Sequence, residues 1–111
     1  MTKAEIIKQH FEEAQSSLAH FLSDDKNFSS IKNAGEQMVL SIKNGGKIIS
    51  CGNGGSMCDA MHFAEELSGK FRNDRKPIAA LSISDASHIS CVGNDYGYEF
   101  TFSRYVEAIG Q

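Results

Sequence analysis

The sequence predicts an α/β fold in which helices flank a doubly wound parallel sheet. Residues 47–50 and 78–83 are short, apolar and rich in β-branched side chains, as buried strands are. A helical pattern over residues 56–71 separates them, and this order predicts a parallel pair of strands joined by a right-handed crossover. A glycine-rich turn at residues 50–56 lies where the first strand passes into that helix.

Two amphipathic helices are predicted ahead of the sheet. Thr2 and Glu5 fit a capping box, and apolar residues follow at helical spacing as far as residue 21. This spacing suits packing against another helix, including one from a second subunit. A second helix over residues 28–43 ends at a strong C-terminal signal, Asn44-Gly45-Gly46. We expect residues 1–44 to form a leading helical hairpin and residues 45–111 to start the α/β sheet.

The remaining segments are shorter. We expect a polar loop at residues 72–76, a short helix at 85–91, a loop at 93–97 and a last helix at 100–109. Two parallel strands alone leave both edges of the sheet unpaired. The sequence therefore predicts that these residues are the front part of a single domain.

Composition excludes several classes of protein. The chain has 111 residues, a formal net charge of −3 and no block of basic residues, so it lacks the electrostatic footprint of a nucleic-acid or anionic-membrane binder. Three cysteines without metal-type spacing indicate free thiols in a reducing compartment. No apolar stretch has transmembrane length and the start does not resemble a signal peptide, so we expect a cytoplasmic protein.

The glycine-rich turn has two interpretations. A P-loop would need a lysine here, and a dinucleotide fingerprint would need glycine in place of Met57. A turn at the carboxyl end of a parallel strand can still bind an anion through free N–H groups, with Ser50, Asn53 and Ser56 as further donors. A plain tight turn capped by Ser56 explains this stretch equally well.

The helix predicted after the turn has one apolar and one polar side. We expect the apolar side to be core; its members are Met57, Ala60, Met61, Phe63, Ala64, Leu67 and Phe71. On the polar side, His62 and Glu66 are an i, i+4 pair whose side chains can converge on one metal ion or substrate. An ordinary polar surface stripe is the alternative. Glu65 points about 100° away from Glu66 and is expected to be a solvated or interface carboxylate.

These residues together resemble the phosphoheptose isomerases, a branch of the sugar isomerase (SIS) domain family. The resemblance runs from the first helix to Gln111 and is densest in residues 50–56, 58–67 and 84–97. It implies the front part of an SIS-type sheet. It also implies an isomerase that converts sedoheptulose 7-phosphate to D-glycero-D-manno-heptose 7-phosphate by enediol proton transfer, in ADP-heptose and lipopolysaccharide core biosynthesis.

The resemblance also assigns roles to individual residues. Asn53, Gly54, Gly55 and Ser56 match a substrate-binding turn, with Ser56 on the phosphate, and Asn94 and Asp95 match a second substrate-binding pair. His62 and Glu66 match zinc ligands, and Glu66 also matches a catalytic acid/base. The other zinc ligands and the second acid/base are expected beyond residue 111. The loop at 74–76 is expected to lie away from this site.

The resemblance further implies a cytoplasmic homotetramer with shared active sites and with no nucleic-acid or membrane partner. The alternative is a non-catalytic SIS-fold binding module, either one that associates with a replication initiator or a phosphosugar sensor. Loss of the helix carboxylate would mark such a module. Because both His62 and Glu66 are present, the sequence favours the isomerase.

Overall fold

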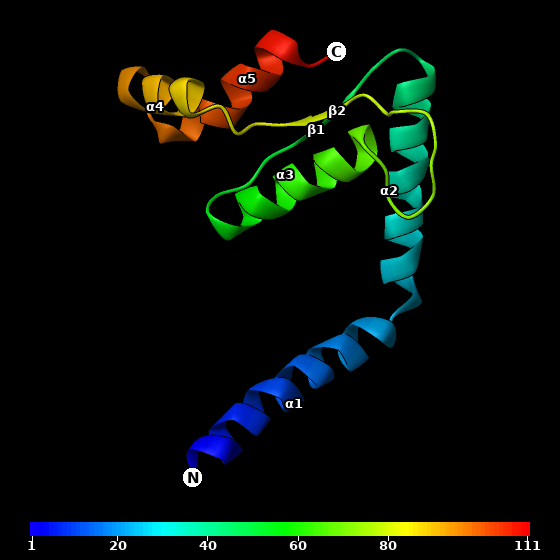
Figure 1. Cartoon of the computed structure of the whole chain (residues 1–111), viewed down its shortest axis with the longest axis vertical. Coiled ribbons are helices and arrows are strands. Elements are labelled where there is room, and N and C mark those ends of the chain that lie inside the picture. The colour runs from blue at the N-terminus through cyan, green and yellow to red at the C-terminus, as the bar shows by residue number, and fades with distance from the viewer. The chain divides into compact units, whose positions relative to one another are not determined.

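A computed structural model describes all of residues 1–111 (Figure 1). In chain order the elements are α1 (Lys3–Leu22), α2 (Asp25–Lys43), β1 (Ile48–Ser50), α3 (Gly55–Ser68), β2 (Ala80–Ser82), α4 (Ala86–Asp95), the 3₁₀ helix η1 (Tyr98–Phe100) and α5 (Thr101–Ile109). Each element lies within a segment, or next to one, for which the sequence predicts that type of structure. None of the helices is both long and apolar enough to span a membrane.

The chain forms two compact units, Met1–Gln37 and Met38–Gln111. The first contains α1 and most of α2. The predicted capping box is confirmed, since Glu5 N–H donates to Thr2 Oγ1 at 3.2 Å while the Glu5 carboxylate accepts from the Thr2 N–H. Neither α1 nor α2 has a buried residue. The domain boundary at residues 44–45 and the helical hairpin stay predictions.

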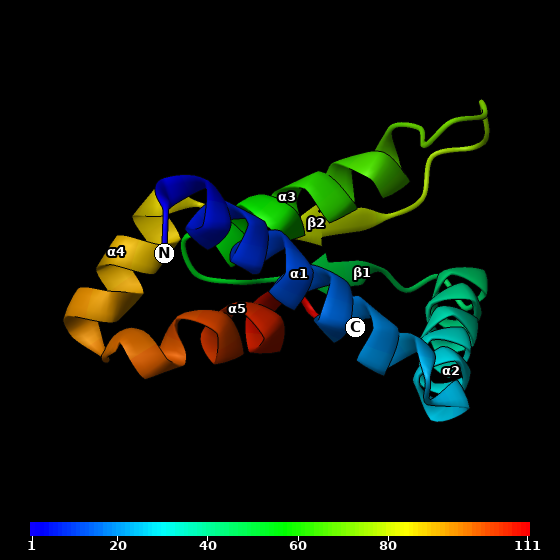
Figure 2. The same ribbon diagram turned by 90° about the horizontal axis from the view of Figure 1, so that it is seen from below.

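The second unit contains the sheet. β1 and β2 pair in parallel, with Ile48 opposite Ala80 and Ser50 opposite Ser82, and α3 is the crossover between them. The predicted strand–helix–strand unit is therefore confirmed. α3 and α5 lie on opposite sides of the two strands in both views (Figures 1 and 2). Because the two strands are parallel, the carboxyl ends of β1 and β2 lie at the same edge of the sheet.

The buried core of this unit is small. Its buried apolar residues are Ala60, Ala64 and Ile83, of which only Ile83 is fully enclosed, at 0% exposed. The prediction that the whole apolar side of α3 is core was wrong: Met61, Phe63 and Phe71 are exposed, with Phe71 at 58%. The physical reason is that the side of α3 buried in this unit is that of its two alanines, whose small side chains allow a close approach, while its large apolar side chains stay exposed.

Two helix boundaries also differ from the predictions. α3 ends at Ser68 instead of residue 71, and α4 continues to Asp95 instead of ending near residue 91. Asn94 and Asp95 therefore occupy the last turn of a helix, whereas the sequence placed them in a loop. The Asp85 side chain caps α4 by accepting from the His88 N–H at 2.8 Å.

Candidate active site

The glycine-rich turn connects the end of β1 to the start of α3. Gly52 passes so close to Ser56 that a Cβ at this position would lie 2.5 Å from the Ser56 carbonyl carbon and oxygen. Only glycine leaves room for that approach. The turn is thus a tightly wound segment at the carboxyl end of the first strand.

Ser56 closes this turn and does not cap the helix. Its Oγ accepts from the Asn53 N–H at 2.7 Å and donates to the Asn53 carbonyl oxygen at 2.8 Å. The N-cap of α3 is Gly54, which has no side-chain capping bond. No hydrogen bond within the chain uses the N–H of Gly54 or Gly55. These two N–H groups at the helix start can therefore donate to an anion.

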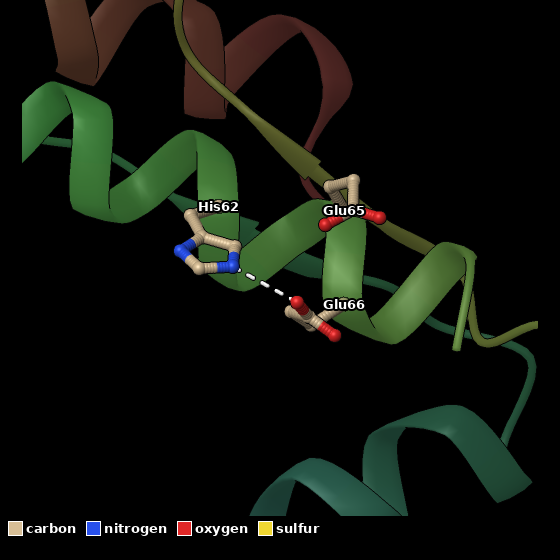
Figure 3. A group of neighbouring side chains, drawn as sticks. All are labelled: His62, Glu65 and Glu66. Carbon is tan, nitrogen blue, oxygen red and sulfur yellow. Dashed lines mark hydrogen bonds and ion pairs between the residues drawn. The ribbon is translucent and has the colours of Figure 1, made fainter. Parts of the chain in front are cut away.

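His62 and Glu66 face each other from successive turns of α3 (Figure 3). His62 Nε2 lies 2.9 Å from Glu66 Oε1. The His62 side chain is 72% exposed and that of Glu66 only 32%. The structure therefore brings the predicted pair into direct contact. A histidine that donates to an ionised Glu66 orients the carboxylate and leaves its other oxygen free.

An open hollow with a volume of about 630 Å³ lies beside this pair. It is lined by Asp59, His62, Phe63, Glu66, Leu67, Phe71 and Arg75. The lining combines apolar side chains, among them Phe63 and Leu67, with ionisable groups such as Glu66. This is the composition expected of a small-molecule site in which a few polar groups fix the ligand.

Glu65 lies nearer to the pair than the helical wheel indicates. One ligand atom from each of His62, Glu65 and Glu66 lies within 4.8 Å of the others. Figure 3 shows Glu65 leaving α3 on the adjacent side of the helix, and its side chain is exposed. The expectation of a solvated carboxylate agrees with that exposure, but its flexible side chain can still reach the pair.

The second predicted binding pair lies in the last turn of α4. Asn94 Nδ2 donates to Asp95 Oδ1 at 3.2 Å, and the Cys91 thiol donates to Asp95 Oδ2 at 3.3 Å. The hydrogen bond between the Cys91 thiol and Asp95, together with the negative charge of Asp95, raises the pKa of that thiol. A hydrogen bond from the Tyr98 hydroxyl to Asn53 Oδ1 connects this region to the glycine turn.

Sequence reasoning missed Arg75 and Tyr98. Arg75 Nη2 donates to the Glu66 carbonyl oxygen at 2.6 Å and Nη1 to that of Leu67 at 2.8 Å. The expectation that the loop at 74–76 lies away from the site was therefore wrong. A basic residue just beyond a helix end could have indicated this contact, because such residues bind free carbonyls. No local signal indicates the role of Tyr98.

The donor set on α3 fits a zinc ion. Zinc in proteins binds imidazole nitrogen and carboxylate oxygen. His62 and Glu66 present one of each, already close together and open to the hollow, and Glu65 offers a further oxygen nearby. All three are on one helix, so the backbone fixes the spacing of their Cα atoms.

Comparison with known proteins gives consistent matches. Residues 9–109 match the SIS domain family. The phosphoheptose isomerase of Cytophaga hutchinsonii is 59% identical over 110 residues, which are 99% of this chain and 57% of that protein. The phosphoheptose isomerase of Tolumonas auensis is 55% identical over 107 residues, 96% of this chain and 56% of that protein. The chain spans about half the length of the curated relatives it matches.

Solved structures agree with these sequence relatives. Phosphoheptose isomerase GmhA from Neisseria gonorrhoeae superposes with a TM-score of 0.87 at 35% identity, over 99% of this chain and 56% of that one. A phosphoheptose isomerase from Francisella tularensis gives the same TM-score at 33% identity, over 100% of this chain and 58% of that one. The predicted front part of an SIS-type fold is confirmed.

Proposed function

The chain belongs to the SIS domain family, and from this premise we propose that it contributes to an aldose–ketose isomerase acting on a phosphosugar. The proposed reaction converts sedoheptulose 7-phosphate to D-glycero-D-manno-heptose 7-phosphate. Relatives that are 55–59% identical and named phosphoheptose isomerase support it. The observation that carries it is the His62–Glu66 pair at the wall of an open hollow, because this isomerisation needs a positioned carboxylate.

The glycine turn supplies the groups that bind the substrate. The free N–H groups of Gly54 and Gly55 donate to oxygen atoms of the sugar phosphate, and the Asn53 amide adds a side-chain donor. Ser56 keeps the turn closed through its two bonds to Asn53. Its role in this proposal is to shape the turn, in addition to the phosphate contact that the family resemblance implies. Asn94 and Asp95 are proposed to bind the same substrate.

Glu66 is proposed to move the proton. Isomerisation removes a proton from the carbon beside the carbonyl, gives an enediol, and returns a proton to the neighbouring carbon. Glu66 is the carboxylate in the hollow that is partly shielded from solvent and held by a neighbour. The contact between His62 Nε2 and Glu66 Oε1 fixes the orientation of the Glu66 carboxyl group. The apolar wall formed by Phe63 and Leu67 reduces access of water to the reacting carbons.

A zinc ion is proposed as cofactor, with His62 and Glu66 as ligands. When bound, such an ion polarises the substrate oxygens as a Lewis acid. The donor types and the spacing of the two side chains support it. A carboxylate that binds a metal is a weaker base, so Glu66 can fill both roles only if one of its oxygens remains free for the proton.

The cellular setting is part of the proposal. We place the reaction in the cytoplasm, in the synthesis of the heptose of the lipopolysaccharide core, with a homotetramer as the active form. Three free, exposed cysteines support a reducing compartment. The exposed apolar side chains of α1 and α2 support association between subunits, because neither helix buries a residue within its own chain.

The test is an isomerase assay in D₂O on the complete gene product that contains residues 1–111. Proton exchange through an enediol should introduce deuterium from the solvent at the reacting carbon, which nuclear magnetic resonance detects. Replacement of Glu66 by glutamine should lower kcat by about 10²–10⁴-fold, the usual contribution of a general base. Circular dichroism and the oligomeric state should be unchanged.

Glu65→Gln is the matched control, because it removes the neighbouring carboxylate on the same helix. It should cost little activity. A larger loss with Glu65→Gln than with Glu66→Gln would reassign the base. Binding of the phosphosugar without turnover by the wild type would instead support the binding-module alternative.

A further inference from the structure

We propose that the Tyr98 hydroxyl is a positioning group that fixes the Asn53 side chain and thereby joins the glycine turn to the end of α4 in the substrate site. This inference rests on the proposed function. Tyr98 Oη donates to Asn53 Oδ1, although the two residues are 45 positions apart in the sequence. Both side chains are exposed, so the bond is not a by-product of core packing. It connects the start of η1 to the turn after β1.

The bond determines which atom Asn53 presents to a ligand. An asparagine amide has an acceptor oxygen and an N–H₂ donor, and rotation of the side chain exchanges them. Ser56 already fixes the Asn53 backbone through bonds of 2.7 and 2.8 Å. Because Tyr98 occupies Oδ1, the Nδ2 donor is left for the ligand. A phosphate or sugar oxygen needs such a donor, whereas an exposed Oδ1 would repel a phosphate.

Tyr98 is itself held in place by the chain around it. Gly97 has a φ of +113° and a ψ of 150°, a conformation that glycine adopts and other residues avoid. The Tyr98 ring lies against α4, since a Cβ on Gly93 would be 4.0 Å from its Cδ2 atom. Asn94 and Asp95 follow directly after Gly93. The Tyr98 side chain therefore contacts both the last turn of α4 and the glycine turn.

The expected effect is on substrate binding. A hydrogen bond that orients a binding group in advance lowers the entropy lost when the ligand binds. Loss of one such neutral bond corresponds to about a threefold to tenfold change in affinity. The chemical step depends on Glu66, which Tyr98 does not contact. We therefore expect a rise in KM with little change in kcat.

The predicted rise in KM is tested by steady-state kinetics on the complete gene product, with sedoheptulose 7-phosphate as substrate. Tyr98→Phe keeps the ring and removes the hydroxyl, and it should raise KM about threefold to tenfold with kcat within about twofold. Tyr96→Phe is the matched control: the Tyr96 hydroxyl makes no hydrogen bond, and its ring packs under Arg104 at 3.9 Å. It should leave both constants unchanged. Equal KM values for Tyr98→Phe and wild type would overturn the proposal.

A double-mutant cycle tests whether Tyr98 acts through Asn53. Asn53→Ala should raise KM, and adding Tyr98→Phe to it should cause no further rise, because the bond is already absent. The same fold-change in both backgrounds would mean that Tyr98 acts elsewhere and would overturn the positioning role.

A spectroscopic measurement separates this proposal from the proposed function. In ¹⁵N-labelled protein, Tyr98→Phe should shift the side-chain amide resonances of Asn53, and Tyr96→Phe should not. If the wild type has no isomerase activity, the proposed function fails, and this shift still decides whether the bond exists. Unshifted Asn53 resonances in Tyr98→Phe would overturn the inference whatever the activity.

Discussion

His62 lies on α3 with its imidazole 2.9 Å from the Glu66 carboxylate and largely open to solvent. If His62 binds zinc through an imidazole nitrogen, His62→Ala should lower both the zinc content of the purified complete gene product and its activity. His10→Ala on α1 is the control, because His10 has only an exposed neighbour, Glu13, at 3.8 Å. Elemental analysis of both variants beside the wild type provides the measurement. An active wild type that contains no metal and tolerates chelators would leave His62 as a substrate contact.

Cys91 offers a second test of a single residue. The hydrogen bond to Asp95, together with the charge of that carboxylate, raises the pKa of the Cys91 thiol. Alkylation requires the thiolate, so a raised pKa slows the reaction at a given pH. Asp95→Asn should therefore accelerate labelling of Cys91 by iodoacetamide at pH 8. Mass spectrometry can follow it, with exposed Cys58 in the same molecule as reference. A constant Cys91-to-Cys58 rate ratio would show that Asp95 does not control the thiol.

Site residues could be predicted where their partners are near in sequence. Helical periodicity alone predicts that His62 and Glu66 converge, and the structure shows this contact. The contact between Tyr98 and Asn53 depends on tertiary structure that brings η1 to the glycine turn, so no spacing rule reveals it. For Ser56, the sequence could not distinguish a helix cap from a bond back to Asn53, because both use the same hydroxyl.

Among the elements, α3 has a C-terminal end that is held by the Arg75 side chain and by the Ile78 N–H, which donates to the Leu67 carbonyl oxygen at 3.0 Å. The Arg75 guanidinium binds the carbonyl oxygens of Glu66 and Leu67, which have no partner within the helix. Arg75→Ala should lower the free energy of unfolding by about 1.5–3 kcal/mol, the range for hydrogen bonds to a charged group. It should also lower kcat, because the last turn carries Glu66. Urea titration and the isomerase assay measure the two effects.

Two further variants control for charge. Lys76→Ala removes a neighbouring exposed cation and should have little effect on either measurement. Arg75→Lys keeps the charge but lacks the planar fork that reaches several carbonyls, so it should recover only part of the stability. If Arg75→Ala unfolded at the same urea concentration as the wild type, the contacts of Arg75 would make no contribution to stability.

Element type was predictable, whereas element ends and packing were less so. α1 carries a local start signal, Thr2 with Glu5, and α2 ends at Lys43 before a glycine pair. α3 stops earlier than its apolar pattern indicates, because the chain turns at Gly69. Hydrophobicity also predicted too large a core, since the pattern shows which side chains are apolar but not how closely Ala60 and Ala64 bring the helix to the strands.

For the whole molecule, the apolar side of α1 is an exposed surface available for subunit contact. Phe11 is 74% exposed, and α1 buries no residue. Phe11→Glu should therefore weaken assembly of the complete gene product and shift it toward smaller species in light scattering after size exclusion. Gln9→Glu, on another side of α1, is the control and should leave the assembly unchanged. An unaltered mass for Phe11→Glu would mean that this surface takes no part in subunit contact.

The bond between Ile83 N–H and the Ser50 carbonyl oxygen, 2.8 Å long, extends the pairing of the strands beyond the last register pair. Ile83 is also the most enclosed apolar residue of the chain. Local openings of a native protein begin where few groups are buried, and the amides of enclosed strands exchange with solvent last. The glycine turn begins at Ser50, the last residue of β1. We therefore expect the base of the proposed binding turn to belong to the segment whose amides exchange with solvent last.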